Sequence, residues 1–120
     1  MPENNAIINI KNLRLRTFIG FNPEEQEKQQ DVIINAEIHY PTYSACETDN
    51  QDDAVNYKDI TKRMISWVEE GKFKLLEKLS ADLLDISLEH KHVKYAKVSV
   101  DKPHALRFAD SVSITMEGRK

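Results

Sequence analysis

The segment VIINAEIHYP, residues 32–41, decides the fold class. Apolar side chains recur at every second position of it, at Val32, Ile34, Ala36, Ile38 and Tyr40. This period of two predicts a strand with one buried side, and Pro41 is expected to end it. A similar alternation upstream predicts another strand over residues 8–16. The alternation is interrupted at Lys11-Asn12, which indicates a bulge or a change of register there.

The period changes to a helical one after residue 56. Apolar residues fall at positions i, i+4, i+7 and i+8, namely Ile60, Met64, Trp67 and Val68. This spacing predicts an amphipathic helix that begins after an N-cap at Asn56 and stops at Gly71. A second helix is predicted from about residue 75 to about residue 90. Its expected core stripe consists of Leu75, Leu76, Leu79, Leu83 and Ile86.

Alternation returns in two further predicted strands, over residues 93–101 and 110–117. The segments between the elements, residues 20–30 and 41–55, are polar and are expected to be loops. The resulting order ββααββ predicts one α+β domain over residues 1–120, with a mostly antiparallel four-stranded sheet and both helices on one of its faces. The other face is either ordinary solvent-exposed surface or a wet but enclosed one, and its residues are small and polar: Asn35, Glu37, His39, Lys97, Ser99, Ser111, Ser113 and Thr115.

Composition excludes several classes of protein. The chain has 120 residues, 17 Lys and Arg against 20 Asp and Glu, and a formal charge of −3, which argues against a nucleic-acid-binding protein. No apolar run is long enough to span a membrane, and the first ten residues do not resemble a signal peptide. With Cys46 as the single cysteine and four scattered histidines, no disulfide and no metal site are predicted. We therefore expect a soluble cytoplasmic protein without nucleic-acid or membrane partners.

The common catalytic motifs are absent, including a glycine-rich phosphate loop, His-Glu-x-x-His, Cys-x-x-Cys and Gly-x-Ser-x-Gly. Four side chains remain where loops or element ends can converge: Glu25, Tyr57, Glu77 and Lys102. Each has an ordinary structural explanation when it is taken alone. A carboxylate in a first helical turn, such as Glu77, is favoured by the helix dipole whatever its function.

Taken together, the sequence around these four residues resembles the dihydroneopterin aldolase family. The matching segments are NYKDI at 56–60, LLEKL at 75–79, DKP at 101–103, and a carboxylate five residues after Gly20. Two longer runs, IKNLRLRTFIG at 10–20 and DKPHALRFADSVS at 101–113, are similar to the epimerase branch of that family. The resemblance covers essentially the whole chain, and the sequence departs from the aldolase pattern around residues 104–110.

The resemblance implies the tunnelling fold. In this fold four subunits join their sheets into a barrel with the helices outside, and two such rings usually stack into an octamer. The small polar sheet face would then line the tunnel, and closure of the barrel would pair the open sheet edges. Active sites in this family lie between neighbouring subunits, so a homo-oligomer is expected.

The implied reaction is epimerisation at C2′ of 7,8-dihydroneopterin triphosphate in pterin biosynthesis. By resemblance Lys102 is the acid/base, Tyr57 is its partner in proton transfer, Glu77 with Leu76 holds the pterin ring, and Glu25 completes the site. The pterin itself accepts the electrons, so neither a cofactor nor a metal is expected. The triphosphate requires cations, for which His104 and Arg107 are the first candidates and Arg14 or Arg16 the next. The alternatives are an aldolase that releases glycolaldehyde and a non-enzymatic pterin- or purine-binding module.

Overall fold

The strand predicted from residues 32–41 lies in the middle of a five-stranded sheet. In the computed structural model, which describes residues 4–120, β2 (Gln30–Pro41) pairs antiparallel with β1 (Asn5–Ile19) on one side and with β4 (Tyr95–Pro103) on the other. β5 (Ser111–Arg119) pairs antiparallel with β4. Residues 1–3 of the predicted domain lie outside the described part of the chain.

The prediction of a four-stranded sheet was wrong by one strand. β3 (Lys72–Phe73) adds to the end of β1 in parallel, which gives the order β3-β1-β2-β4-β5. The backbone N–H of Gly20 donates a hydrogen bond to the carbonyl of Phe73 (2.9 Å) and fastens this short strand. Two residues are too few to show an alternation, so periodicity gave no signal for β3.

The irregularity predicted in the first strand is confirmed. The pairing of β1 with β2 shifts register between Ile10 and Leu13. Asn12 adopts a left-handed conformation (φ +53°) there, and its backbone N–H donates to Oδ1 of Asn35 at 2.9 Å. The bulge therefore keeps both halves of β1 in phase with the core.

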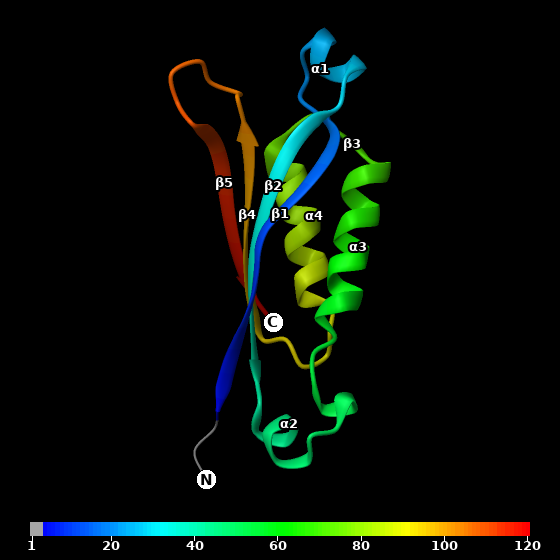
Figure 1. Cartoon of the computed structure of the whole chain (residues 1–120), viewed down its shortest axis with the longest axis vertical. Coiled ribbons are helices and arrows are strands. Elements are labelled where there is room, and N and C mark those ends of the chain that lie inside the picture. Colours follow the sequence, from blue (N-terminus) through cyan, green and yellow to red (C-terminus); the bar gives the residue numbers. More distant parts are fainter. Residues whose placement is uncertain (1–3) are drawn as a thin grey trace.

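Two helices cover one face of the sheet (Figure 1). α3 (Tyr57–Glu70) begins as predicted, because Oδ1 of Asn56 accepts from the backbone N–H of Asp59, and it ends at Gly71. α4 (Leu76–Leu88) begins one residue later than expected. The helices and the sheet enclose an apolar core that includes Ile34, Ile38, Met64, Val68, Leu79, Leu83, Val98 and Val100.

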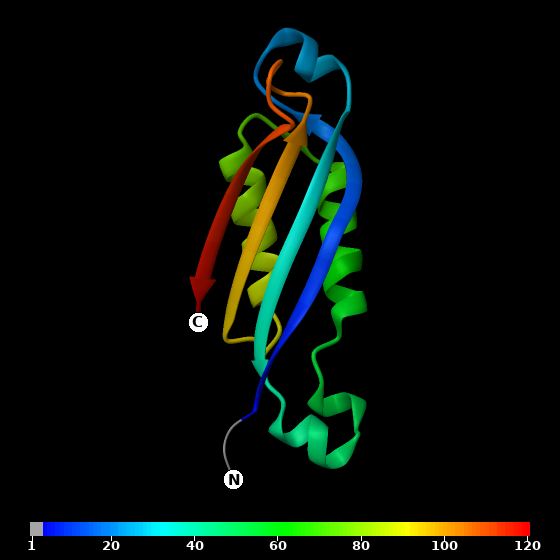
Figure 2. The ribbon, with the colours of Figure 1, turned by 60° about the vertical axis from the view of Figure 1, so that its left-hand side comes forward.

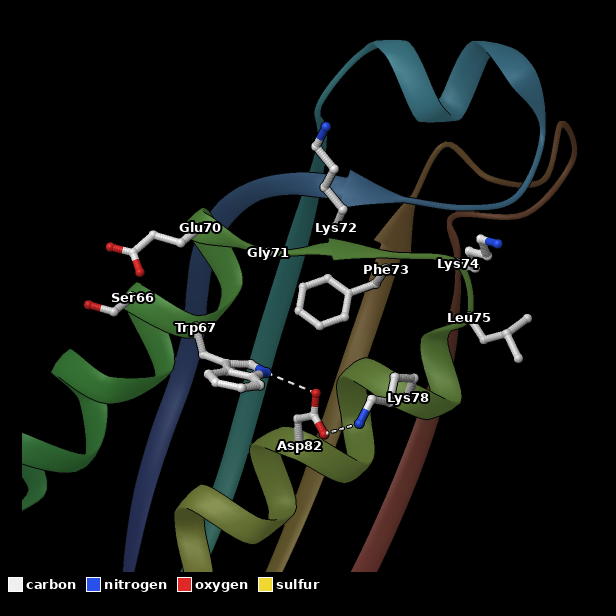
Figure 3. A pocket seen from close by; sticks show the side chains of 10 residues that line it. All are labelled: Ser66, Trp67, Glu70, Gly71, Lys72, Phe73, Lys74, Leu75, Lys78 and Asp82. Atoms are coloured by element: carbon white, nitrogen blue, oxygen red, sulfur yellow. Dashed lines mark hydrogen bonds and ion pairs between the residues drawn. The ribbon is translucent and has the colours of Figure 1, made fainter.

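Two residues of the predicted helical stripes lie outside this core. Leu75 precedes α4 as its N-cap and is 48% exposed. Trp67 is 50% exposed, and its indole N–H donates to Oδ2 of Asp82 on α4 (2.8 Å) instead of being buried. Both residues lie near the junction of α3, β3 and α4 (Figure 3).

The two predicted loops contain short helical segments. α1 (Pro23–Glu27) lies in the first, and the second contains α2 (Tyr43–Thr48) and a 3-10 turn over Gln51–Asp53. Proline at the first position of α1 suits a helix start, and Asn50 caps the 3-10 turn by accepting from the backbone N–H of Asp52. These elements have at most two turns and no buried residue, so no apolar stripe marks them in the sequence.

The molecule measures 55 × 27 × 21 Å. α1 and the loop between β4 and β5 lie at one end of the long axis and α2 lies at the other, while α3 begins in the half of the molecule nearer α2 (Figure 1). No described helix covers the second face of the sheet (Figure 2), where Asn9, Glu37, Lys97 and Glu117 stand in register across four strands. Within residues 4–120, no helix is both long and apolar enough to span a membrane.

Candidate functional site

Two of the predicted site residues meet at one end of the sheet. Lys102 stands near the end of β4, and its Nζ pairs with Oε2 of Glu25 on α1, 77 residues away in the chain. The side chains are only 12% and 21% exposed, respectively, so this ion pair is largely shielded from solvent. The hydrogen bond from Lys102 lowers the pKa of the Glu25 carboxyl, and a second one from Gln30 lowers it further. Glu25 is therefore a carboxylate at neutral pH.

Glu25 is held from two other directions. The side-chain amide of Gln30 donates to Oε2 of Glu25 (3.1 Å) and to the carbonyl of Ile19 (2.9 Å). Gly20 adopts φ +127°, and a Cβ built on it would collide with the Glu25 carboxylate. Only glycine permits this close approach, which is how the loop after β1 brings a carboxylate to Lys102. Sequence reasoning missed Gln30, because a glutamine in a polar segment carries no signal of its own.

Glu77 and Leu76 occupy the first turn of α4, at the same end of the molecule. The chain reaches them from Phe73, whose carbonyl accepts from Gly20, through Lys74 and Leu75. Glu77 is exposed, and among residues 4–120 no hydrogen bond or ion pair joins it to Glu25 or Lys102. Its carboxylate is therefore free to accept hydrogen bonds from a ligand.

A hollow of about 720 Å³ opens beside the start of α4 (Figure 3). Trp67, Phe73 and Leu75 supply its apolar wall, while Lys72, Lys74 and Lys78 add positive charge. Lys78 is engaged, because its Nζ donates to Oδ1 of Asp82 at 2.9 Å.

Lys72 and Lys74 also line a smaller hollow of about 250 Å³ together with Phe18, Gly20 and Gln26. Basic and aromatic surface thus extends from α4 to the glycine that contacts Glu25. Lys72, Phe73 and Lys74 carried no signal in the sequence, because the two-residue strand β3 shows no periodicity.

Tyr57 lies far along the molecule from Glu25 and Lys102. It is the first residue of α3, is 54% exposed, and lines a separate cavity of about 740 Å³. α1, which carries Glu25, lies at one end of the long axis, and α3 begins far from it, in the half of the molecule nearer α2 (Figure 1). One subunit therefore does not bring Tyr57 together with Lys102.

The predicted phosphate-binding cations fall into two groups. His104 and Arg107 lie on the exposed loop directly after Lys102 and Pro103, where His104 has φ +65° and the Arg107 guanidinium lies 5.6 Å from the Phe108 ring centroid. Arg14 and Arg16 lie on β1. Arg16 forms an ion pair with Asp31 (3.3 Å), and its guanidinium donates a hydrogen bond to the carbonyl of Gln29 (2.9 Å).

Comparison with known proteins gives consistent results. A dihydroneopterin aldolase family model matches residues 8–117. The chain is 52% identical over its full length to the full-length dihydroneopterin triphosphate 2′-epimerase of Escherichia coli K12. It is also 52% identical to the enzyme of that name from Pseudomonas aeruginosa, over 96% of this chain and 94% of the relative.

A solved structure shows the same fold. The dihydroneopterin aldolase of E. coli, crystallised in complex with neopterin, superposes with a TM-score of 0.88 at 26% identity, over 94% of this chain and 98% of the other. The structural likeness and the matching sequence segments extend over nearly the whole chain. The protein thus belongs to the dihydroneopterin aldolase family.

Proposed function

We propose that this protein is an isomerase that converts 7,8-dihydroneopterin triphosphate into its C2′ epimer, 7,8-dihydromonapterin triphosphate. The observation that carries the proposal is the full-length identity of 52% to proteins that are named for this reaction. The ion pair of Glu25 with Lys102 supports it by placing an amine that can donate and accept protons beside a fixed carboxylate.

The reaction is a retro-aldol cleavage followed by an aldol addition. Removal of the 2′-hydroxyl proton lets the C1′–C2′ bond break, and its electron pair moves into the C6=N5 imine of the pterin. C2′ becomes the carbonyl carbon of an aldehyde that carries the triphosphate. When this aldehyde turns over, C1′ adds to its other face, and the oxygen regains a proton. C2′ is inverted, and no atom is gained or lost.

Lys102 is the residue proposed to exchange that proton. Its ammonium would stabilise the alkoxide on the 2′-oxygen through a charge-assisted hydrogen bond. Glu25 fixes the position of the amine, since its carboxylate is itself held by Gln30. Among residues 4–120, the ion pair that Lys102 forms is the one with Glu25, so the amine is held in place while it can still turn one N–H toward a substrate.

Glu77 is proposed to anchor the pterin, with Leu76 beside it. A carboxylate accepts two parallel hydrogen bonds from an amino group and an adjacent ring N–H, as the pterin presents them. The exposed first turn of α4 and the aromatic and apolar surface of Phe73 and Leu75 suit a flat heterocycle. His104 and Arg107 follow Lys102 on the exposed loop after β4, where they can contact a bound substrate.

The site is proposed to be completed by Tyr57 of a neighbouring subunit. The outer edge of β1 is unpaired from Asn5 to Thr17, and β5 has an unpaired outer edge as well, in the part of the chain that the structure describes. Successive antiparallel pairings make β5 run antiparallel to β1. The β5 edge of one subunit can therefore extend the β1 edge of the next in the same antiparallel pattern. Four such junctions would close a barrel, and we propose a ring tetramer that stacks into an octamer.

Incubation with dihydroneopterin triphosphate and, separately, with dihydroneopterin tests the function. Chromatography would resolve the C2′ epimers from the cleavage product, 6-hydroxymethyl-dihydropterin. The proposal expects the epimer as the main product from the triphosphate. Glycolaldehyde or its triphosphate as the main co-product from both substrates would instead identify an aldolase. Binding of either substrate without turnover would identify a pterin-binding module.

A further inference from the structure

The cavity at the start of α3 has a different character from the hollows near Lys102. It measures about 740 Å³, and nine residues line it: Gln51, Asp52, Ala54, Val55, Asn56, Tyr57, Lys58, His90 and Lys91. Tyr57 is the one residue of this cavity that the proposed reaction uses. The role of the remaining polar residues is therefore open.

Positive charge predominates in this cavity. Lys58 and Lys91 are exposed, and neither forms an ion pair within residues 4–120. A third ammonium, that of Lys120, donates to the carbonyl of His90 at 2.5 Å. Asp52 is the one acidic residue among the nine that line the cavity.

His90 adds a neutral hydrogen-bond donor to these cations. The backbone N–H of His92 donates to Nδ1 of His90 (3.1 Å), which leaves the proton of the neutral ring on Nε2. Burial lowers the pKa of His90, and the nearby His92, Lys120 and Lys91 lower it further. The ring is therefore uncharged at neutral pH.

We propose that this cavity binds the triphosphate of the substrate whose pterin is held at Lys102 of the neighbouring subunit, with Lys58 and Lys91 as its principal ligands. This inference rests on the proposed function and on the shared site. Tyr57 must reach the 2′-oxygen, and Lys58 follows Tyr57 directly and lines the same cavity. The phosphates are attached to C3′, one carbon from C2′, so they lie on the side from which Tyr57 approaches.

The same arrangement determines the outcome of cleavage. When the C1′–C2′ bond breaks, the triphosphate leaves with the aldehyde, while the pterin half stays bound at Glu77. Cations that hold the triphosphate therefore hold the aldehyde next to C1′ until it adds again. Loss of these cations is expected both to weaken binding and to let more aldehyde escape.

Lys58→Ala tests the proposal, with Lys62→Ala as the matched control. Lys62 is an exposed lysine one turn further along α3 that does not line the cavity. We expect Lys58→Ala to lower the ratio of kcat/KM for dihydroneopterin triphosphate to that for dihydroneopterin by about tenfold or more, as loss of a charge-assisted hydrogen bond would. The fraction of triphosphate substrate that ends as 6-hydroxymethyl-dihydropterin should rise in the same variant, and Lys62→Ala should change neither quantity.

Competition between inorganic tripolyphosphate and substrate for binding provides a second readout, and it does not depend on which product the variant forms. Tripolyphosphate should compete with substrate in the wild-type enzyme and in Lys62→Ala, and should compete about tenfold less well in Lys91→Ala. If light scattering shows that Lys58→Ala fails to assemble, Lys91→Ala replaces it in the test. The ratio of kcat/KM for dihydroneopterin triphosphate to that for dihydroneopterin should then fall in Lys91→Ala.

An unchanged ratio and an unchanged product fraction in the assembled variants would overturn the proposal. If the ratio of kcat/KM values fell in Lys74→Ala instead, the triphosphate would bind in the hollow beside Gly20, and the proposal would be wrong. Failure of the wild-type enzyme to epimerise the triphosphate substrate would refute the proposed function itself, so the two failures are distinguishable.

Discussion

Glu25 and Lys102 are joined by an ion pair at one end of the sheet, and Gln30 and Gly20 also contact the carboxylate and fix its position. Lys102 is thereby held near the end of β4 and cannot move freely in solvent. A positioned amine of this kind can exchange a proton with a bound substrate at low entropic cost.

Lys102→Ala is predicted to retain the fold and pterin binding but to reduce kcat by about 10²-fold or more, because a positioned acid/base group contributes at least that much. Steady-state kinetics and pterin titration measure the two effects separately. Lys94→Ala, which removes an exposed lysine just before β4, is the control and should retain wild-type kcat. Near-full turnover by Lys102→Ala would remove Lys102 from the mechanism.

The ion pair also predicts how stability depends on pH. The pKa of Glu25 in the folded state is lowered from its ordinary value of 4.5, so the carboxylate stabilises the fold above that pH. This contribution is lost as pH falls through the lowered value. Thermal unfolding should therefore show that Glu25→Gln has a Tm lower than wild type by about a few degrees at pH 7 and that this difference shrinks as the pH falls below 4.5. The control Glu24→Gln changes an exposed neighbour, and its Tm should match that of wild type at each pH. A Tm difference between Glu25→Gln and wild type that grows on acidification would contradict a stabilising role for the Glu25 carboxylate.

Gly20 is predicted to tolerate no side chain. Gly20→Ala places a Cβ against the Glu25 carboxylate in a backbone conformation that alanine rarely adopts, at a cost of about 1–3 kcal/mol. Denaturant unfolding should show this loss, and kcat should fall because Glu25 is displaced. Gly118→Ala is the matched control, since its Cβ would meet Leu84 at an ordinary 3.4 Å. Equal stability of the two variants would refute the steric role of Gly20.

The sharing of the site between subunits can be tested by mixing inactive variants. Tyr57→Phe and Lys102→Ala, unfolded together and reassembled, should recover about a quarter of the activity, because one junction in four receives both intact halves. Glu25→Gln mixed with Lys102→Ala is the control and should recover none of the activity lost, because these residues come from the same end of one subunit. An active monomer in light scattering, or equal recovery in the two mixtures, would contradict a site composed of Tyr57 and Lys102 from different subunits.

Much of the fold was predictable because its long elements have regular patterns. Alternation such as that in residues 32–41 predicted four strands, and apolar spacing such as that of Ile60 and Met64 predicted two helices, since one side of each element must be buried. β3 and the helical turns at Pro23–Glu27 and Tyr43–Thr48 were missed, because such short elements depend on backbone hydrogen bonds and caps that leave no period.

The candidate site, like the fold, could be predicted only in part. The sequence segments around Glu25, Glu77 and Lys102 could be recognised, and the structure places all three at one end of the subunit. That Gln30 holds Glu25, and that Tyr57 lies far from Lys102, could not be predicted, because both depend on how the elements are placed in space. Periodicity fixes which side of an element is buried, but it does not fix which ends of different elements meet.

The most direct test of the account is the approach to equilibrium from both epimers. Proton NMR would follow one sample that starts from 7,8-dihydroneopterin triphosphate and another that starts from 7,8-dihydromonapterin triphosphate, each with the wild-type enzyme. The account predicts that both samples reach the same ratio of the two epimers, with 6-hydroxymethyl-dihydropterin only a minor product, and that Lys102→Ala leaves both samples unchanged over the same time. Conversion of either sample mainly to 6-hydroxymethyl-dihydropterin, or to two different final ratios, would contradict it.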